Sequence, residues 1–211
     1  MSNVKVKICG LRRIEDIKYA NMLLPDYIGF ILADGFVRQI TKEMAWEFCS
    51  QLDRRIKRVG VFVNQSVETV AEYINCGIIQ YVQLHGDEDN LYIEKLKKYI
   101  KNDFGIIKAV RVRNAEDIEK AKVYNCDYLL LDAYSEKQVG GGSITFDWTL
   151  IKNITKPFFL AGGLSPSNVK DAIERVKPYA VDASSSMETD GYKDYNKIKA
   201  FIDAVHGGCY E

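Results

Sequence analysis

Short apolar runs alternate with longer segments whose apolar residues recur at helical spacing, and this rhythm extends along the whole chain. The short runs are rich in β-branched and aromatic residues, which is typical of buried strands. We identify eight: VKVKIC (4–9), YIGFIL (27–32), RVGVFV (58–63), QYVQLH (80–85), GIIKAV (105–110), DYLLLD (127–132), PFFLA (157–161) and YAVDA (179–183). Strands that alternate with helices predict βα units and a parallel sheet.

The helical segments carry recognisable start signals. Asn114 is followed three residues later by Asp117, a variant of the capping-box pattern, and Ser165-Pro166 places a hydroxyl before a proline at the expected first helical position. The segment FDWTLI (146–151) is too short for more than one or two turns.

Eight βα units in 211 residues lie near the lower size limit of a closed barrel. An open, doubly wound sheet is the competing architecture, but a sheet this wide would leave two edges to protect. We therefore expect an α/β fold with one (β/α)8 TIM barrel of parallel strands. No linker or composition change divides the chain, so the expected domain is 1–211.

The composition excludes several classes of function. Lysine plus arginine equals aspartate plus glutamate at 29 each, so the chain lacks the broad positive charge that nucleic acid or an anionic membrane surface would attract. The first apolar run contains Lys5 and Lys7, and no run approaches the roughly 18 residues of a membrane span. We expect a cytoplasmic protein with no nucleic-acid or membrane partner.

The cysteines fit a reducing compartment. There are five of them, an odd number, and none belongs to a CxxC pair, so neither a disulfide framework nor a zinc site is indicated. Cys49, Cys76 and Cys126 lie in or beside helical segments and are interpreted as packing residues.

Reactive residue types recur at the ends of the predicted strands. Cys9 ends the first strand, His85 the fourth and Asp132 the sixth, and Asp182 lies near the end of the eighth. The carboxyl ends of barrel strands form the catalytic face of this fold. The sequence therefore predicts that these four side chains meet at one mouth.

Strand alternation refines this picture, because side chains two residues apart share a face. Lys5, Lys7 and Cys9 would point into the barrel, where a cation near the thiol would favour the thiolate. Asp132 would point inward above mainly apolar neighbours, which favour a protonated carboxyl group.

The same alternation directs Tyr81, Gln83 and His85 inward on the fourth strand. Glycine and serine concentrate after the last three strands, in GGGS (140–143), AGGL (161–164) and DASSS (182–186). Glycine lets a backbone approach a ligand closely, and the helix expected at Ser165-Pro166 would present amides to an anion.

Each feature also has a purely structural interpretation. Free cysteines are usually small buried hydrophobes, and strand-end aspartates often cap loops or form ion pairs. His85 could be a satisfied polar residue, paired glycines usually mark turns, and Arg38 alone would be a surface cation. Only the joint placement at one rim favours a site.

Taken together, the motifs resemble the phosphoribosylanthranilate isomerase family, in family order and over nearly the whole chain. They are KICGL (7–11), GFIL…R (29–38), VGVFVN (59–64), VQLHGDE (82–88), LLLDA (129–133), GGG…TFDW (140–148), LAGGLSPSNV (160–169) and DASSSME…GYKD (182–194). The resemblance implies an Amadori rearrangement of N-(5-phosphoribosyl)anthranilate, with no cofactor and no metal. The implied partner is a small phosphosugar, and the implied assembly is a monomer or a homodimer.

The resemblance also implies roles for individual residues. Asp132 would protonate the furanose ring oxygen and Cys9 would remove the C2′ proton. Arg38 would lie near the anthranilate carboxylate. Lys7, His85 and Asp182 are expected to contact the substrate, and its phosphate is expected at Gly141, Gly142, Gly162, Gly163, Ser184, Ser185 and Ser186.

Three segments depart from the family pattern. Phe36-Val37 replaces the usual serine-proline before Arg38, Ser143 and Ile144 alter the glycine-rich loop, and Ser186 replaces a glycine. Serine cannot cheaply adopt a positive φ, so we expect weaker phosphate binding at Ser186.

Two alternatives follow. One is another phosphosugar barrel enzyme, such as an epimerase or a related pathway isomerase, although the KICG cysteine and the lack of a metal-ligand set oppose an epimerase. The other is a degenerate barrel that binds a phosphorylated ligand or a protein without turnover.

Overall fold

The eight predicted strands close into one barrel in a computed structural model that describes residues 3–133 and 145–207. Each strand pairs in parallel with its sequence neighbours, and the last strand pairs with the first, with Lys7 opposite Asp182. The strands are β1 (Lys5–Cys9), β2 (Tyr27–Ile31), β3 (Lys57–Phe62), β4 (Tyr81–Leu84), β5 (Gly105–Val112), β6 (Tyr128–Ala133), β7 (Phe158–Leu160) and β8 (Ala180–Ala183). The predicted parallel barrel is confirmed.

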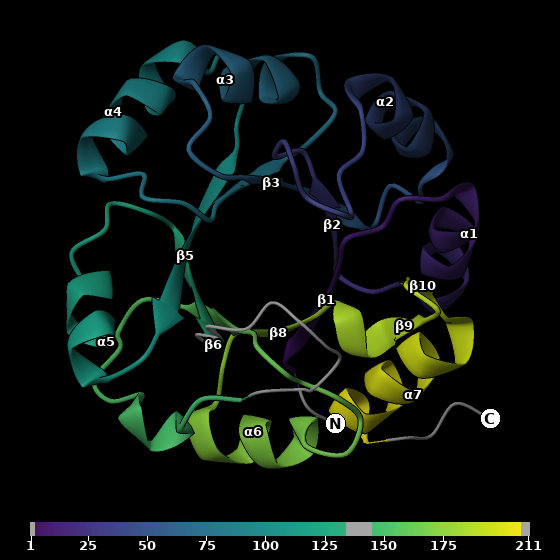
Figure 1. Cartoon of the computed structure of the whole chain (residues 1–211), viewed down its shortest axis with the longest axis vertical. Helices are drawn as coiled ribbons and strands as arrows, with labels where there is room; N and C mark the ends of the chain where they lie inside the picture. Colours follow the sequence, from purple (N-terminus) through teal and green to yellow (C-terminus); the bar gives the residue numbers. More distant parts are fainter. Residues whose placement is uncertain (1–2, 134–144, 208–211) are drawn as a thin grey trace.

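Helices form a ring around this barrel (Figure 1). They are α1 (Ile14–Leu23), α2 (Lys42–Gln51), α3 (Val67–Asn75), α4 (Asn90–Tyr99), α5 (Ala115–Ala121), α6 (Val169–Val176) and α7 (Tyr195–His206). In the described part of the connection between β6 and β7, the predicted short helical segment is one 3-10 turn, Trp148–Leu150. None of the helices in the described ranges has both the length and the apolar character that a bilayer crossing requires.

Side-chain caps explain where several helices begin. Asn114 accepts hydrogen bonds from the backbone N–H groups of Glu116 and Asp117, as predicted for α5. The predicted start at Ser165-Pro166 is wrong, because α6 begins at Val169 and its cap position is Asn168. The side-chain oxygen of Asn168 instead accepts from the Ser165 N–H, which tightens the turn before the helix.

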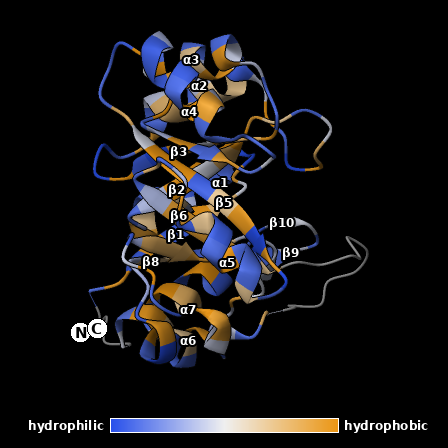
Figure 2. Cartoon of the chain, turned by 90° about the vertical axis from the view of Figure 1, so that its left-hand side faces the viewer, coloured by the Kyte–Doolittle hydropathy of each residue, from blue (hydrophilic) through white to orange (hydrophobic). Residues whose placement is uncertain are grey.

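Two apolar layers hold the barrel together. The outer layer lies between strands and helices and includes Val6 and Ile8, the residues of β1 that alternate with its inward-facing side chains. Figure 2 shows mainly hydrophilic loops at the two ends of the barrel and hydrophobic stretches along the strands and helices between them.

The inner layer fills the end of the barrel where the strands begin. Tyr27, Tyr81, Tyr128, Phe159 and Tyr179 form this aromatic floor, with ring centroids of contacting pairs 5.0 to 6.3 Å apart. The hydroxyls of Tyr27 and Tyr179 are hydrogen-bonded at 2.8 Å. The aromatic floor therefore packs the barrel interior at the end opposite Cys9 and Asp132.

A small two-stranded ribbon follows β8 and was not predicted. A 3-10 turn, Ser185–Met187, leads into β9 (Glu188–Thr189), which pairs antiparallel with β10 (Tyr192–Lys193). The ribbon brings Glu188 and Lys193 back toward the barrel mouth, close to Arg38.

The free cysteines outside the site differ in their surroundings. Cys126 is buried, and Cys49 is half-buried with its thiol donating to the Ile78 carbonyl. Cys76 is exposed at the end of α3, so interpreting it as a packing residue is wrong.

Candidate active site

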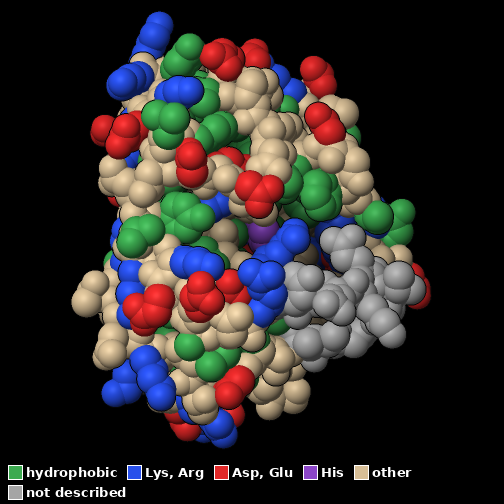
Figure 3. Space-filling view, turned by 60° about the vertical axis from the view of Figure 1, so that its left-hand side comes forward, with side chains coloured by type: hydrophobic (Ala, Val, Ile, Leu, Met, Phe, Trp, Pro, Cys, Tyr) green, Lys and Arg blue, Asp and Glu red, His purple; other side chains and the backbone are tan. Residues whose placement is uncertain are grey.

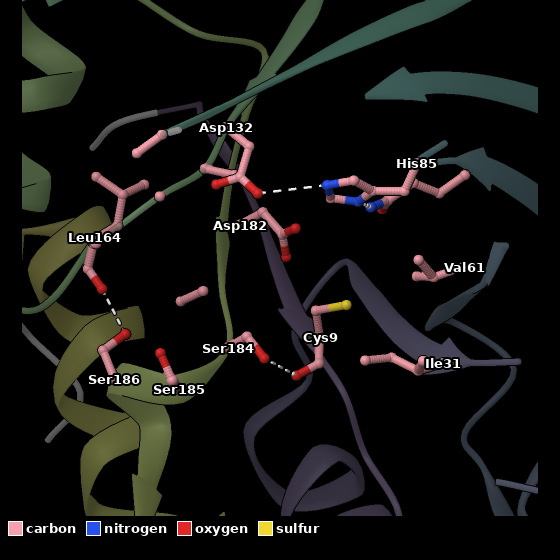
Figure 4. Close-up of a pocket in the computed structure, with 16 residues that line it drawn as sticks. Cys9, Ile31, Val61, His85, Asp132, Leu164, Asp182, Ser184, Ser185 and Ser186 are labelled. Atoms are coloured by element: carbon pink, nitrogen blue, oxygen red, sulfur yellow. Dashed lines mark hydrogen bonds and ion pairs between the residues drawn. The ribbon is translucent and has the colours of Figure 1, made fainter. Parts of the chain in front are cut away.

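A cavity of about 310 Å³ opens at the carboxyl ends of the strands. Figure 3 shows this face as hollowed, with lysine and arginine side chains beside a histidine in the hollow. The cavity is lined by Cys9, Ile31, Val61, Gln83, His85, Asp132, Ala133, Ala161, Gly162, Gly163, Leu164, Asp182, Ala183 and Ser184–Ser186. The four reactive strand-end residues predicted to meet, Cys9, His85, Asp132 and Asp182, do lie together (Figure 4).

Lys7 lies beneath the cavity and does not line it. Its side chain is fully buried, and its Nζ is 2.9 Å from Oδ2 of Asp182. Burial lowers the pKa of Lys7, but the Asp182 carboxylate, together with Cys9, outweighs burial and holds that pKa above its ordinary value. Lys7 is therefore a buried cation that supports Asp182 from below.

Asp182 has one carboxylate oxygen available to a ligand. Its Oδ1 is buried and has no hydrogen-bond partner among the described residues, whereas Oδ2 is held by Lys7. A buried acceptor without a partner is costly, and a ligand hydroxyl would satisfy it. Figure 4 shows Asp182 in the middle of the cavity, between Cys9 and Asp132.

The Cys9 thiol is buried, and its pKa is set mainly by that burial. Burial raises the pKa above the ordinary thiol value, Lys7 and Lys193 act to lower it, and Asp182 raises it further. Lys7 acts in the direction predicted from the sequence, because it lowers the pKa of the thiol, but loss of water outweighs the nearby cations. The absence of a side chain at Gly29 gives the sulfur its space, since a Cβ there would lie 2.6 Å from Sγ.

Asp132 faces an imidazole rather than only apolar neighbours. Its Oδ2 is 3.5 Å from Nε2 of His85, and Nδ1 of the same ring is 2.9 Å from the amide nitrogen of Gln83. Both Gln83 and His85 point inward from the fourth strand, as strand alternation predicts. The expectation of mainly apolar surroundings for Asp132 missed this polar partner.

The expected phosphate-binding residues that the structure describes line one side of the cavity. These are Gly162, Gly163 and Ser184–Ser186, whereas Gly141, Gly142 and Ser143 lie outside the described residues. Gly162 has a φ of 85°, and a Cβ there would lie 2.4 Å from the backbone nitrogen of Ala133. Only glycine fits this close approach.

Ser186 does not strain the backbone. Its φ is not positive, and its hydroxyl donates to the Leu164 carbonyl at 2.5 Å. The expectation that serine here would be conformationally costly is wrong, which removes one reason to consider a degenerate barrel. The Ser184 hydroxyl donates to the Cys9 carbonyl at 3.0 Å, and the Ser185 hydroxyl has no hydrogen-bond partner among the described residues.

Arg38 is engaged by the ribbon after β8. Its Nε and Nη2 donate to the two oxygens of Glu188 at 2.7 and 2.8 Å, and Glu188 also accepts from Lys193 at 2.6 Å. Arg38 does not line the cavity of about 310 Å³. The pairing joins residues 150 apart in the chain, so local sequence reasoning could not find it.

A bay of about 260 Å³ adjoins the cavity and shares five lining residues with it, Ile31, Val61, His85, Asp132 and Ala133. Its other walls are Ala33, Phe36, Val63 and Arg111. Arg111 is the cation of the bay and was missed in the sequence. It has no ion pair or hydrogen bond within the described ranges. The signal was present, because Ile107 and Ala109 are inner-layer residues of β5 and alternation then turns residue 111 inward.

Within the described part of the chain, no group of three or more histidine, cysteine, aspartate or glutamate side chains is placed to hold a metal ion. What the site offers is a thiol, a carboxyl group with an imidazole beside it, a partly unsatisfied carboxylate and a glycine- and serine-rich wall. Such a set can move protons on a bound anionic ligand.

Comparisons with known proteins agree with this geometry. The model of the family described as "PRAI: N-(5'phosphoribosyl)anthranilate (PRA) isomerase" matches residues 6–204. A relative from Thermoanaerobacter pseudethanolicus, named N-(5'-phosphoribosyl)anthranilate isomerase, is 46% identical over 209 residues, covering 97% of this chain and 98% of that protein.

Solved structures give the same result. The phosphoribosyl anthranilate isomerase of Thermotoga maritima superposes with a TM-score of 0.86 at 36% identity, covering 97% of this chain and 99% of that one. A structure described as the isomerase in complex with reduced 1-(o-carboxyphenylamino)-1-deoxyribulose 5-phosphate has a TM-score of 0.83 at 35% identity, with the same coverage. The chain therefore belongs to the N-(5'-phosphoribosyl)anthranilate isomerase family.

Proposed function

We propose that this chain is an isomerase of tryptophan biosynthesis that converts N-(5'-phosphoribosyl)anthranilate to 1-(o-carboxyphenylamino)-1-deoxyribulose 5-phosphate. One observation carries the proposal: Cys9 and Asp132, from strands far apart in the sequence, line a single cavity at the barrel mouth. The rearrangement needs one acid and one base on either side of a bound ribose, and these two side chains supply them.

Asp132 acts first, as the general acid. In its protonated form it gives its proton to the furanose ring oxygen, the bond between that oxygen and C1′ breaks, and the nitrogen lone pair forms a Schiff base with C1′. Asp132 is left as a carboxylate, which faces Nε2 of His85.

Cys9 acts second, as the general base. Its thiolate removes the proton from C2′, and the electron pair of that C–H bond moves to give an enolamine, which tautomerises to the ketone. Two buried cations, Lys7 and Lys193, act to lower the pKa of this thiol against the effect of burial. They therefore stabilise the reactive thiolate when it forms.

The phosphate occupies the wall formed by Gly162, Gly163 and Ser184–Ser186. The backbone at these two glycines, both of positive φ, and the Ser185 hydroxyl, which has no hydrogen-bond partner among the described residues, provide donors for phosphate oxygens. The unpartnered Oδ1 of Asp182 accepts a hydrogen bond from a ribose hydroxyl.

The anthranilate ring occupies the adjoining bay, whose walls are mostly apolar and include Phe36. Two arginines can receive its carboxylate. Arg38 is the one that the family resemblance implies, but Glu188 already binds two of its nitrogens. Arg111 lines the bay itself, so the geometry adds it as a second carboxylate receptor.

The decisive experiment follows the loss of substrate fluorescence as phosphoribosylanthranilate is consumed. We expect turnover by the wild-type protein and losses of about a hundredfold or more in kcat for Cys9→Ala and for Asp132→Asn, the usual range for a general base or acid. Cys76→Ala is the matched control, because that thiol is exposed at the end of α3. The proposal fails if wild-type protein gives no turnover, or if both site variants keep full activity.

A further inference from the structure

A chain of three polar side chains leads from the fourth strand to the general acid. The amide nitrogen of Gln83 is 2.9 Å from Nδ1 of His85, and Nε2 of the same ring is 3.5 Å from Oδ2 of Asp132. Gln83 is 2% exposed, and the His85 side chain is 19% exposed in the cavity wall. The proposed mechanism so far gives Gln83 no role and His85 only that of a neighbour.

The chemistry of a neutral imidazole fixes where its proton lies. One ring nitrogen carries the proton and the other accepts a hydrogen bond. Because the Gln83 amide N–H₂ can only donate, Nδ1 of His85 must be the acceptor, and the ring proton then lies on Nε2. That Nε2–H faces the carboxyl group of Asp132.

We infer that Gln83 locks His85 in the Nε2–H tautomer, and that His85 is a positioning residue that holds Asp132 and stabilises its carboxylate as it gives up its proton. This inference rests on the proposed function of Asp132. The interaction of this Nε2–H with Asp132 strengthens during the acid step, because a carboxylate is a better acceptor than a carboxylic acid. An interaction that strengthens toward the transition state raises kcat rather than substrate affinity.

A packing role alone explains Gln83 poorly. Its Oε1 is buried and has no hydrogen-bond partner in the described ranges, so the amide bears an unsatisfied acceptor. An apolar residue of the same size would avoid that cost. Holding a donor against Nδ1 of His85 is the one feature that such a residue could not reproduce.

The chain offers a clean spectroscopic test, because it has two histidines, His85 and His206. In protein labelled with ¹⁵N-histidine, the nitrogen chemical shifts distinguish the two neutral tautomers and the imidazolium. His206, on α7, serves as the internal reference, and a His85→Asn variant assigns the remaining signals. We expect the Nε2–H form for His85 at neutral pH; an Nδ1–H form or a doubly protonated ring would overturn the inference.

Kinetics then test the catalytic half of the inference. Gln83→Leu keeps the size of the side chain and removes the donor, and we expect kcat to fall roughly ten- to hundredfold with KM changed less than about threefold. Gln83→Glu presents an acceptor to Nδ1, so it should draw a proton onto that nitrogen in the spectrum and also lower kcat.

Gln80→Leu is the matched control, because Gln80 directly precedes the strand β4 that carries Gln83. Gln80 accepts from the Arg58 backbone N–H at the floor end of the barrel, so its loss should cost stability but leave kcat and the His85 spectrum unchanged. A folded Gln83→Leu variant with wild-type kcat would refute the catalytic half of the inference. Turnover by wild-type protein and the His85 spectrum are measured separately, so failure of the proposed function and failure of the tautomer lock are distinguishable.

Discussion

Replacing Gly162 with alanine tests whether the wall of the site depends on one close backbone contact. Gly162 has a φ of 85°, and its new Cβ would lie 2.4 Å from the nitrogen and 2.5 Å from the Cβ of Ala133. Ala133 directly follows Asp132 at the end of β6. Relief of the contact must therefore move the backbone that carries the general acid.

The cost has two parts. Forcing a residue with a Cβ into the left-handed region costs about 1–2 kcal/mol, and overpacking against backbone adds roughly 1–3 kcal/mol. The expected loss in the free energy of unfolding is therefore about 2–5 kcal/mol for Gly162→Ala. Gly77→Ala is the matched control, because Gly77 has a φ of 79° but no heavy atom within 4 Å of the added Cβ, so it carries the first part alone.

Urea denaturation of the two variants measures both free energies, and the difference between them isolates the contact with Ala133. The fluorescence assay should show a lower kcat for Gly162→Ala and an unchanged kcat for Gly77→Ala, since misplacement of a catalytic group by about 1 Å can cost on the order of a hundredfold. If Gly162→Ala loses no more stability than Gly77→Ala, then the close approach to Ala133 is not a determinant of this wall, and our reasoning is wrong.

Two further predictions concern the reactive groups. Because burial holds the pKa of Cys9 above that of an ordinary thiol, the thiolate fraction of Cys9 should rise with pH through neutrality and should not level off by about pH 8.5; a plateau below pH 7 in the thiolate absorbance of wild-type protein minus Cys9→Ala would contradict this. Arg111→Met should raise KM about tenfold or more by removing a charged contact with the substrate. Arg38→Met should also lower thermal stability, because it releases Glu188 from its ion pair. If KM is unchanged in Arg111→Met, Arg38 is the carboxylate receptor.

The barrel could be predicted because its strands are short apolar runs. Their side chains alternate between the barrel interior and the layer of helices. All eight strands were placed within two residues at either end, and the convergence of Cys9, His85, Asp132 and Asp182 followed from their positions at strand ends. The alternation of inward- and outward-facing side chains would also have identified Arg111, if the fifth predicted strand had been extended by the two further residues that β5 includes.

What could not be predicted depends on contacts between distant segments. The fork between Arg38 and Glu188 requires knowing that a ribbon after β8 folds back over the first βα loops. The raised pKa of Cys9 depends on how completely the surrounding strands exclude water, which no motif encodes. The start of α6 was misplaced because the Asn168 side chain, rather than the Ser165 hydroxyl, organises the preceding turn.

The aromatic floor has a consequence for how the protein can change. Because Tyr27, Tyr81, Tyr128, Phe159 and Tyr179 pack against one another at the lower end of the barrel, the cavity that holds the reactive residues lies at the loop-bearing mouth. The aromatic packing therefore lies at one end of the barrel and the reactive side chains lie at the other. Substitutions in the aromatic floor can therefore change the melting temperature while the reactive residues are conserved. The loops at the mouth can diverge while the barrel keeps its fold.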